Sequence, residues 1–183
     1  LGSDTPPTCY DDVELADMIC FWGHNARGAH PILFWRVADY KSKKNVPTLV
    51  VDPRRTGTVM GLEDINPKTS HHFPTINGDI SIQNAIAYAI IKRHPEAVAW
   101  DFLKKHTSGW EAYVKEVEEG YRPEDVVDRT KIAPEKIYEV AELWAKASIA
   151  GKKRGSGGVL CIWGIGYNQH LHGQNNTVSL INL

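Results

Sequence analysis

The chain has 183 residues, of which 42% are hydrophobic and 23% are charged, and its formal net charge at pH 7 is -1. These proportions are typical of a globular protein with one sizeable core. Lysine and arginine are spread along the chain, so the sequence predicts no nucleic-acid-binding face, and the longest apolar runs are far too short to cross a bilayer.

The first third of the chain predicts a βαβ unit. The run 18–22 is short, apolar and followed by Gly23, which is typical of a buried strand. Pro31 suits the first turn of a helix, and apolar residues then recur at helical spacing. A second strand at 48–51 ends before Asp52-Pro53. Such a unit is expected to be right-handed, with parallel strands.

The rest of the chain continues the alternation of helices and strands. We expect a loop-rich stretch at 57–78 with a short strand at 71–75, helices from 80 and near 97–106, 109–119, 122–128 and 134–147, a loop at 151–158, and a strand at 159–163. This order predicts a single α/β domain over residues 1–183, with a Rossmann-like, three-layer architecture and a mainly parallel sheet. The last residues, 178–183, are apolar at helical spacing without a stop signal, which indicates a piece of a longer protein.

Glycine and polar residues follow three of the predicted strands, at 23–25, 52–56 and 164–170. In a parallel sheet these segments share one carboxyl edge, where open α/β sheets bind ligands. Glycines permit close backbone approach, helix N-termini attract phosphate, and a carboxylate such as Asp52 can accept hydrogen bonds from ribose. Two plainer interpretations stay open, namely an ordinary turn at Asp52 and tight strand–helix packing at Gly164 and Gly166. The chain has neither a GxGxxG sequence nor a P-loop.

The cysteines and histidines do not predict a metal site. Cys20 and Cys161 lie in apolar runs, where small buried thiols are common, and Cys9 lies in a polar loop. The histidines at 71–72 and 170–172 match no standard zinc spacing, so hydrogen-bonding roles are favoured.

Four ordered motifs resemble the guanine-dinucleotide-binding domain of the molybdopterin oxidoreductases, the dimethyl-sulfoxide-reductase superfamily. The resemblance extends over nearly the whole chain, and the motifs read CYDDVELADMICFWGHNARGAHPIL, LVVDPRRTGT, INGDISIQNAIAYAII and IWGIGYNQHLHG. The opening is most similar to periplasmic and assimilatory nitrate reductases. The middle, TSGWEAYVKEVEEGYRPEDV, is as similar to formate dehydrogenases.

The resemblance implies a site for one molybdopterin guanine dinucleotide. The residues it implies are Trp22, Gly23, His24, Asn25, Ala26, Arg27, Gly28 and Ala29 around the pyrophosphate and guanosine, Asp52, Pro53, Arg54, Arg55 and Thr56 at the ribose and guanine, Asn77, Gly78 and Asp79 at the guanine, and Ile165 and Gln169 nearer the pterin. Asp79 would accept from the guanine N1 and N2 donors. The sequence departs from the family at Gly28, where a glutamate is common, and at 75–76, where an arginine is common.

The resemblance implies that the parent protein is a molybdenum oxidoreductase with a bis-(molybdopterin guanine dinucleotide) cofactor. Nitrate reduction to nitrite is the preferred activity, formate dehydrogenation is the alternative, and a non-catalytic nucleotide-binding module is a third possibility. The 4Fe-4S cysteines and the molybdenum ligand would lie upstream, so this segment alone is expected to be inactive. Its partners would be the remaining domains of the parent and an electron-donor protein or subunit. The sequence leaves the compartment, periplasmic or cytoplasmic, open.

Overall fold

The fold is built on a four-stranded, all-parallel sheet. A computed structural model describes residues 6–76 and 78–183. The strands are β1 (Ala16–Trp22), β2 (Thr48–Val51), β3 (Ser70–Phe73) and β4 (Gly158–Trp163), in the spatial order β3-β2-β1-β4. Each strand pairs in parallel with its neighbours, so the α/β class and the parallel sheet predicted from the sequence are confirmed.

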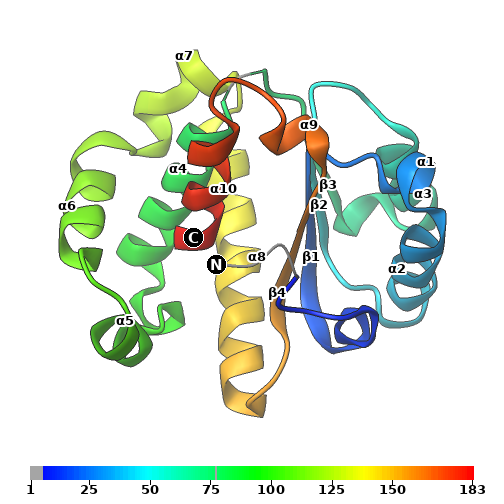
Figure 1. Ribbon diagram of the computed structural model, residues 1–183, viewed down its shortest axis with the longest axis horizontal. Coiled ribbons are helices and arrows are strands. Elements are labelled where there is room, and N and C mark those ends of the chain that lie inside the picture. Colours follow the sequence, from blue (N-terminus) through cyan, green and yellow to red (C-terminus); the bar gives the residue numbers. More distant parts are fainter. Residues whose placement is uncertain (1–5, 77) are drawn as a thin grey trace.

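Helices cover both faces of this sheet (Figure 1). They are α1 (Ala26–Ala29), α2 (Pro31–Lys44), α3 (Gly57–Ile65), α4 (Asp79–Arg93), α5 (Trp100–His106), α6 (Trp110–Gly120), α7 (Val127–Thr130), α8 (Pro134–Arg154), α9 (Ile165–Asn168) and α10 (Gly173–Asn182). Short 3-10 segments are η1 (Tyr10–Leu15), η2 (Pro67–Thr69), η3 (Pro95–Ala97) and η4 (Pro123–Val126). The first three α-helices lie on one face, α4, α8 and α10 lie on the other, and α5 and α6 lie outside α4.

The central strand β1 divides the apolar core in two. Met18, Cys20 and Trp22 point into the cluster beneath α4 and α8, whereas Ile19 and Phe21 point into the cluster beneath α2 and α3. All five are fully buried. A parallel strand covered on both faces must be apolar at every position, and this explains why the run 18–22 lacks the polar alternation of a half-exposed strand.

The loop predicted after residue 57 is instead the helix α3. Its sequence contains Gly57 and Gly61 beside the β-branched Thr58 and Val59, which lowers helix propensity. Tertiary packing overrides that propensity, because α3 contributes buried apolar side chains to the α2-side core. Thr56 caps the helix, since its hydroxyl accepts a hydrogen bond from the amide of Val59 at 3.5 Å.

Helix α8 is longer than the sequence predicted, because it continues through residues 151–154. Gly151 lies inside it for a packing reason, since a Cβ there would stand 2.6 Å from the amide nitrogen of Gly158. The helix ends at Gly155, which has a φ of +75°. Although α8 has 21 residues, no helix in the described ranges combines the length and apolarity that a membrane span requires.

A buried lysine joins α2 to the sheet. The ammonium of Lys41, which is 1% exposed, donates to the carbonyl oxygens of Val46 and Thr69 and to the Thr69 hydroxyl, at 2.9–3.0 Å. Burial lowers the pKa of Lys41 to about 8. Three oxygen acceptors therefore replace the water that this cation loses on folding.

Candidate functional site

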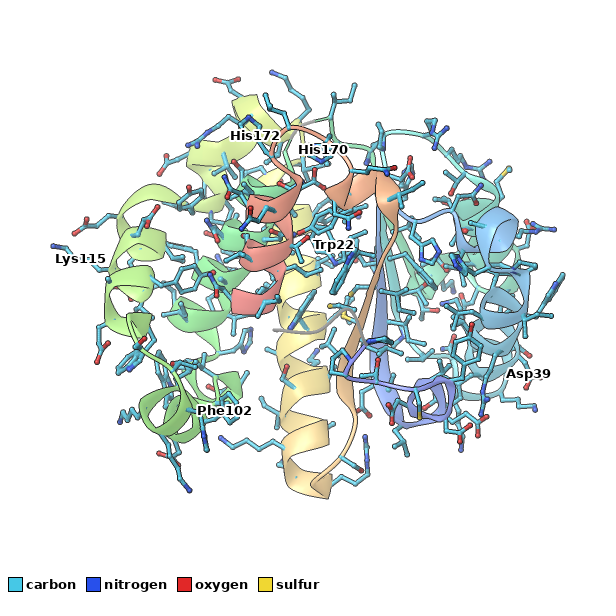
Figure 2. All side chains as sticks on the ribbon, viewed as in Figure 1. Trp22, Asp39, Phe102, Lys115, His170 and His172 are labelled. Atoms are coloured by element: carbon cyan, nitrogen blue, oxygen red, sulfur yellow. The ribbon has the colours of Figure 1, made fainter. Side chains whose placement is uncertain are left out.

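The predicted site segments meet at the carboxyl edge of the sheet. After β1 the chain passes to α1 and α2 on one face, whereas after β4 it passes to α10 on the other. The carboxyl ends of β1 and β4 thus form the topological switch point, which is where open α/β sheets bind ligands. In Figure 2, His170 and His172 lie at this end of the molecule, beyond α9, and Trp22 lies inside below them.

The glycines of β1 and β4 let two strand-end turns pack directly against each other. Gly23 has a φ of +53°, and a Cβ there would stand 2.5 Å from the amide nitrogen of Tyr167. The Gly164 amide donates to the carbonyl of Trp22 at 3.0 Å, and Cβ atoms built on Gly164 and Gly166 would stand 2.9 and 2.8 Å from the Gly23 carbonyl oxygen. These contacts agree with the tight packing that the sequence left open for Gly164 and Gly166, and Gly23 takes part in the same packing.

Hydrogen bonds fix the turn after β1 to the start of α3. The Asn25 side-chain oxygen accepts from the amide of Thr58 at 3.3 Å and from its hydroxyl at 3.1 Å. The Arg27 amide in turn donates to the Thr58 hydroxyl at 2.9 Å. Asn25 therefore sets the spacing between two of the predicted segments, and Thr58, which the sequence analysis did not single out, is its partner.

The three arginines predicted at the site are placed differently. The Arg27 guanidinium lies 5.9 Å from the ring centre of Phe34, and Arg55 forms an ion pair with Glu63 of α3 at 2.5 Å. Both are therefore engaged by the helices on the α2 side. The side chain of Arg54 is 79% exposed, and its nearest ionic contact is Asp52 at 3.6 Å. The Arg54 side chain is thus more exposed than that of Arg55, which is 60% exposed, and is available to an anion in solution.

Asp52 shapes the turn after β2. Its carboxylate is buried and accepts from the amide of Arg54 at 2.9 Å, and its carbonyl oxygen is 2.8 Å from the Nε2 atom of His72. This hydrogen bond forms an Asx turn, which agrees with the plainer interpretation of Asp52 as part of an ordinary turn. His72 has the hydrogen-bonding role favoured for the histidines at 71–72. Pro53 is exposed beside it.

Asp79 is the first residue of α4 and stands at the same edge. Burial raises the pKa of its carboxyl group, a hydrogen bond to its own backbone opposes that shift, and His170 and Asp52 act on the carboxyl group electrostatically in opposite directions. Asp79 is therefore within electrostatic reach of the segments that follow β2 and β4. Gly78 precedes Asp79, and a Cβ atom added to this glycine would stand only 2.3 Å from the Thr75 hydroxyl oxygen. Asn77 lies outside the described residues.

A buried tyrosine connects this edge to the helices behind it. The Tyr167 hydroxyl accepts from the Gln83 side-chain amide and donates to the carbonyl of Asn176, and its ring centre lies 5.9 Å from that of Trp22. Asn176 also donates to the Tyr167 carbonyl at 3.0 Å and contacts the His170 ring at 3.0 Å. Sequence reasoning missed this network, although Gln83 lies one helical turn after Asp79. Ile165 is exposed, as is Gln169.

Four buried polar atoms near this edge have no partner within residues 6–76 and 78–183. They are Trp22 Nε1, His24 Nδ1, Thr75 Oγ1 and Gln83 Oε1. An unpaired buried polar group costs roughly 1–3 kcal/mol, so such atoms are uncommon without a reason. They belong to β1, the turn after it, the segment before α4, and α4 itself. Together with Asp79 and the exposed Arg54, these atoms make the carboxyl edge of the sheet rich in polar groups.

An apolar cavity of about 350 Å³ lies elsewhere, between α4, α5, α6 and the end of α10. Its wall includes Ile90, Phe102, Trp110, Tyr113 and Leu183, and none of its lining residues carries a formal charge. A phosphate group would find no cationic partner there. The carboxyl edge of the sheet is therefore the better candidate for a nucleotide site.

The turn after β1 contains a histidine pair that predicts a pH-dependent stability. His24 is 4% exposed, and its Nε2 atom is 2.8 Å from Nδ1 of His30. Burial, with the charge of His30 adding to it, lowers the pKa of His24 from 6.5 to about 4. The unfolded chain therefore binds this proton more tightly than the folded chain does. The stability that neutral His24 contributes is complete above pH 6.5 and is lost as the pH falls toward 4.

We expect the free energy of unfolding to fall by about 3 kcal/mol between pH 7 and pH 4 on account of His24, since one pKa unit corresponds to about 1.4 kcal/mol. This fall is measured by urea unfolding of the wild type and of His24→Gln at both pH values. The free energy of unfolding of the variant should lack the part of the fall that is due to His24. His172→Gln, at an exposed histidine, is the matched control and should retain it. Equal pH dependence in wild type and His24→Gln would contradict the prediction.

Comparisons with known proteins agree with this architecture. The family model described as molybdopterin oxidoreductase matches residues 4–183. A nitrate reductase from Synechocystis sp. is 32% identical over the whole chain, which spans 23% of that protein. A periplasmic nitrate reductase from Campylobacter fetus subsp. fetus is 40% identical over 56% of the chain and 11% of its own length. The chain thus spans about a quarter or less of the curated relatives it matches.

A solved structure shows the same fold. Acetylene hydratase from Pelobacter acetylenicus superposes with a TM-score of 0.69 over 93% of the chain and 21% of its own length, at 16% sequence identity. At this identity the likeness concerns the fold alone. The match of the family model over residues 4–183 carries the assignment. The chain belongs to the molybdopterin oxidoreductase family.

Proposed function

We propose that this chain holds the guanosine end of one molybdopterin guanine dinucleotide in a parent nitrate reductase. The observation that carries the proposal is the 32% identity over the full chain to a nitrate reductase. The periplasmic nitrate reductase, at 40% identity over a shorter stretch, supports it. The arrangement of the carboxyl edge is consistent with such a role, because it gathers a carboxylate, an exposed guanidinium and helix N-termini at the switch point.

The proposal gives each part of the edge a physical task. The Asp79 carboxylate offers two acceptors to the two adjacent donors of guanine, N1 and N2. The exposed Arg54 guanidinium is available to the ribose and guanine, and Asn25 and Thr58 hold the turn after β1 against α3. Gly23 and Tyr167 keep the strand ends of β1 and β4 in contact. In this proposal Ile165, the first residue of α9, and Gln169, which follows that helix, contact the cofactor nearer its pterin; both are exposed.

When bound, the molybdenum cofactor supplies the two-electron chemistry by which nitrate, with two protons, becomes nitrite and water. The residues of this chain bind and orient one end of that cofactor. The proposal places the molybdenum ligand, the second dinucleotide contacts and a 4Fe-4S cluster in other parts of the parent, and an electron donor outside it. The relatives are long enough to contain those parts, because the chain covers only 23% of the Synechocystis protein.

The alternative activity within the family is formate dehydrogenation, which the segment 107–126 suggested. That segment forms α6 and η4, on the outer side of α4. η4 leads directly into α7, and Thr130 of α7 stands beside Gly78, since a Cβ on that glycine would be 3.1 Å from the Thr130 Cα atom. The similarity of this segment to formate dehydrogenases keeps that activity as the alternative. The likeness to nitrate reductases includes the strand ends themselves, because it extends along the whole chain.

We expect the purified parent protein to reduce nitrate with a reduced viologen dye and to leave formate unoxidised with an oxidised dye. Molybdenum analysis and extraction of the guanine dinucleotide on the same sample test the cofactor separately from the substrate. The 183-residue chain alone is the control and should turn over neither substrate. Formate oxidation without nitrate reduction would replace the activity proposed here. A parent without molybdenum would indicate the non-catalytic module instead.

A further inference from the structure

Two of the three cysteines of the chain face each other across neighbouring strands. Cys20 of β1 and Cys161 of β4 are register partners in the parallel pairing of these strands. Cys20 is fully buried in the apolar core beneath α4 and α8, and Cys161 packs on that same core. Both side chains therefore leave the sheet on the same face and in the same row. The fold thus brings together two thiols that lie in distant parts of the sequence.

The spacing of the strands suits a disulfide that can be formed and broken. Register partners on neighbouring strands are about 4.8 Å apart, and the Cα atoms of a disulfide are usually about 4.4–6.8 Å apart. The Cβ atoms of a disulfide are closer, at about 3.8 Å, so the strands would have to approach each other slightly at this row. A disulfide formed under such a constraint is more readily reduced than a relaxed one. The row therefore suits a reversible link.

The two thiols differ in their environments, and this difference sets the order in which they react. Burial raises the pKa of the Cys20 thiol, and the neighbouring Cys161 thiol raises it further. Cys20 has no exposed surface, whereas Cys161 is partly exposed. Because oxidants react with the thiolate, and with accessible thiolates first, Cys161 is the residue that an oxidant meets first. Cys20 is then in position to react with the oxidised sulfur.

The neighbouring rows on this face are apolar, and they favour one kind of oxidant. These rows consist of Met18 beside Val159 and of Trp22 beside Trp163, and all four residues pack on the same core. A charged or bulky oxidant, such as a peptide disulfide, would have to lose its solvation or displace these side chains to reach Cys161. Hydrogen peroxide is small and uncharged. The surroundings of the thiol pair therefore favour hydrogen peroxide as its oxidant.

We propose that Cys161 and Cys20, reacting in that order, form a thiol pair that hydrogen peroxide oxidises reversibly to a disulfide between β4 and β1. The Cys161 thiolate attacks one peroxide oxygen, the O–O bond breaks, and the departing hydroxide takes up the proton that Cys161 lost, so that Cys161 becomes a sulfenic acid. The Cys20 sulfur then attacks the Cys161 sulfur, the S–O bond breaks, and the Cys20 proton leaves with that oxygen as water. Two thiols and one peroxide thus give one disulfide and two molecules of water, and the two electrons lost by sulfur reduce the peroxide.

The test is peptide mapping of the full-length parent after reduction, removal of the reductant and exposure to increasing hydrogen peroxide. Free thiols are alkylated during denaturation, and the protein is digested with trypsin and with a protease that cleaves after acidic residues. Because Asp17 lies between Cys9 and Cys20, these two cysteines fall on separate peptides. We expect a linked pair of peptides that contains Cys20 and Cys161 and that dithiothreitol separates into two thiol peptides.

The exposed Cys9 reports the peroxide dose within the same sample. If Cys9 is oxidised while Cys20 and Cys161 are both still alkylated as free thiols, the pair is not a site of oxidation and the proposal is wrong. Irreversible oxidation of Cys161 to a sulfinic acid without a link to Cys20 would overturn it as well.

Single alanine variants of the parent test the order of the two steps. Cys20→Ala should leave Cys161 as a sulfenic acid that dimedone captures, because the second thiol is missing. Cys161→Ala should leave Cys20 as a free thiol at the same peroxide dose, because Cys20 is buried. Cys9→Ala is the matched control and should form the link to the same extent as the wild type. Oxidation of Cys20 in Cys161→Ala as fast as linkage in the wild type would contradict the order, and linkage of Cys161 to another cysteine in Cys20→Ala would contradict the pairing.

Discussion

Gly23→Ala is expected to lower the free energy of unfolding of the 183-residue chain by about 4 kcal/mol. Gly23 has a φ of +53°, and the left-handed conformation costs a residue with a Cβ about 1–2 kcal/mol. The added methyl group would also stand 2.5 Å from the Tyr167 amide nitrogen and 2.7 Å from the Gly166 carbonyl carbon. These are backbone atoms, which cannot turn aside as a flexible side chain can, and overpacking of this kind costs about 1–3 kcal/mol more.

The measurement is urea unfolding followed by tryptophan fluorescence, with Gly109→Ala as the matched control. Gly109 also has a positive φ, +78°, but a Cβ there meets no atom within 4 Å. The control variant therefore has the backbone strain without the clash. Its free energy of unfolding should fall by about 1–2 kcal/mol. If both variants lose the same amount, the contact between the turns after β1 and β4 does not stabilise the fold. In the parent protein, Gly23→Ala should also lower cofactor occupancy, because it separates these two turns.

Asp79→Asn is expected to reduce the preference for guanine over adenine nucleotides by about tenfold or more. The substitution replaces one acceptor oxygen with an NH2 donor that would face the donors of guanine. A hydrogen bond to a charged group contributes roughly 1.5–3 kcal/mol, and leaving a buried donor unpaired costs a similar amount. One decade in affinity corresponds to about 1.4 kcal/mol, so even the lower figure predicts a tenfold change. Burial already raises the pKa of Asp79, because the carboxylate has lost water contacts on folding. Hydrogen bonds from a ligand can replace those contacts.

The measurement is a titration of the cofactor-free parent with guanosine and adenosine diphosphates. Asp101→Asn is the matched control, because Asp101 also lies in the first turn of a helix, α5, and is exposed. It reproduces the loss of a negative charge near a helix N-terminus without touching the sheet edge. An unchanged preference in a folded Asp79→Asn protein would mean that this aspartate serves only the start of α4. That outcome would remove Asp79 from the site without affecting the family assignment.

The sequence by itself determined the strands β1, β2 and β4 and the edge on which their ends meet. The reason is local, since strands covered on both faces must be continuous apolar runs and glycine or Asp-Pro must end them. The four motifs also predicted the family, because their order along the chain survives where single residues differ. The site residues named from those motifs remain a proposal. What the fold adds is that the segments carrying them, apart from Asn77, lie at the carboxyl edge of one parallel sheet.

Tertiary structure alone decided the features that depend on partners distant in sequence. α3 forms in spite of two glycines because its apolar side is needed beneath α2, and Gly151 stays inside α8 because β4 passes too close for a side chain. Lys41 is buried because oxygens of Val46 and Thr69 converge on it, which no local pattern predicts. Tyr167 acquires its role in the same way, through Gln83, which is 84 residues distant. Periodicity reports which side of an element is buried, whereas these contacts depend on which elements the chain brings together.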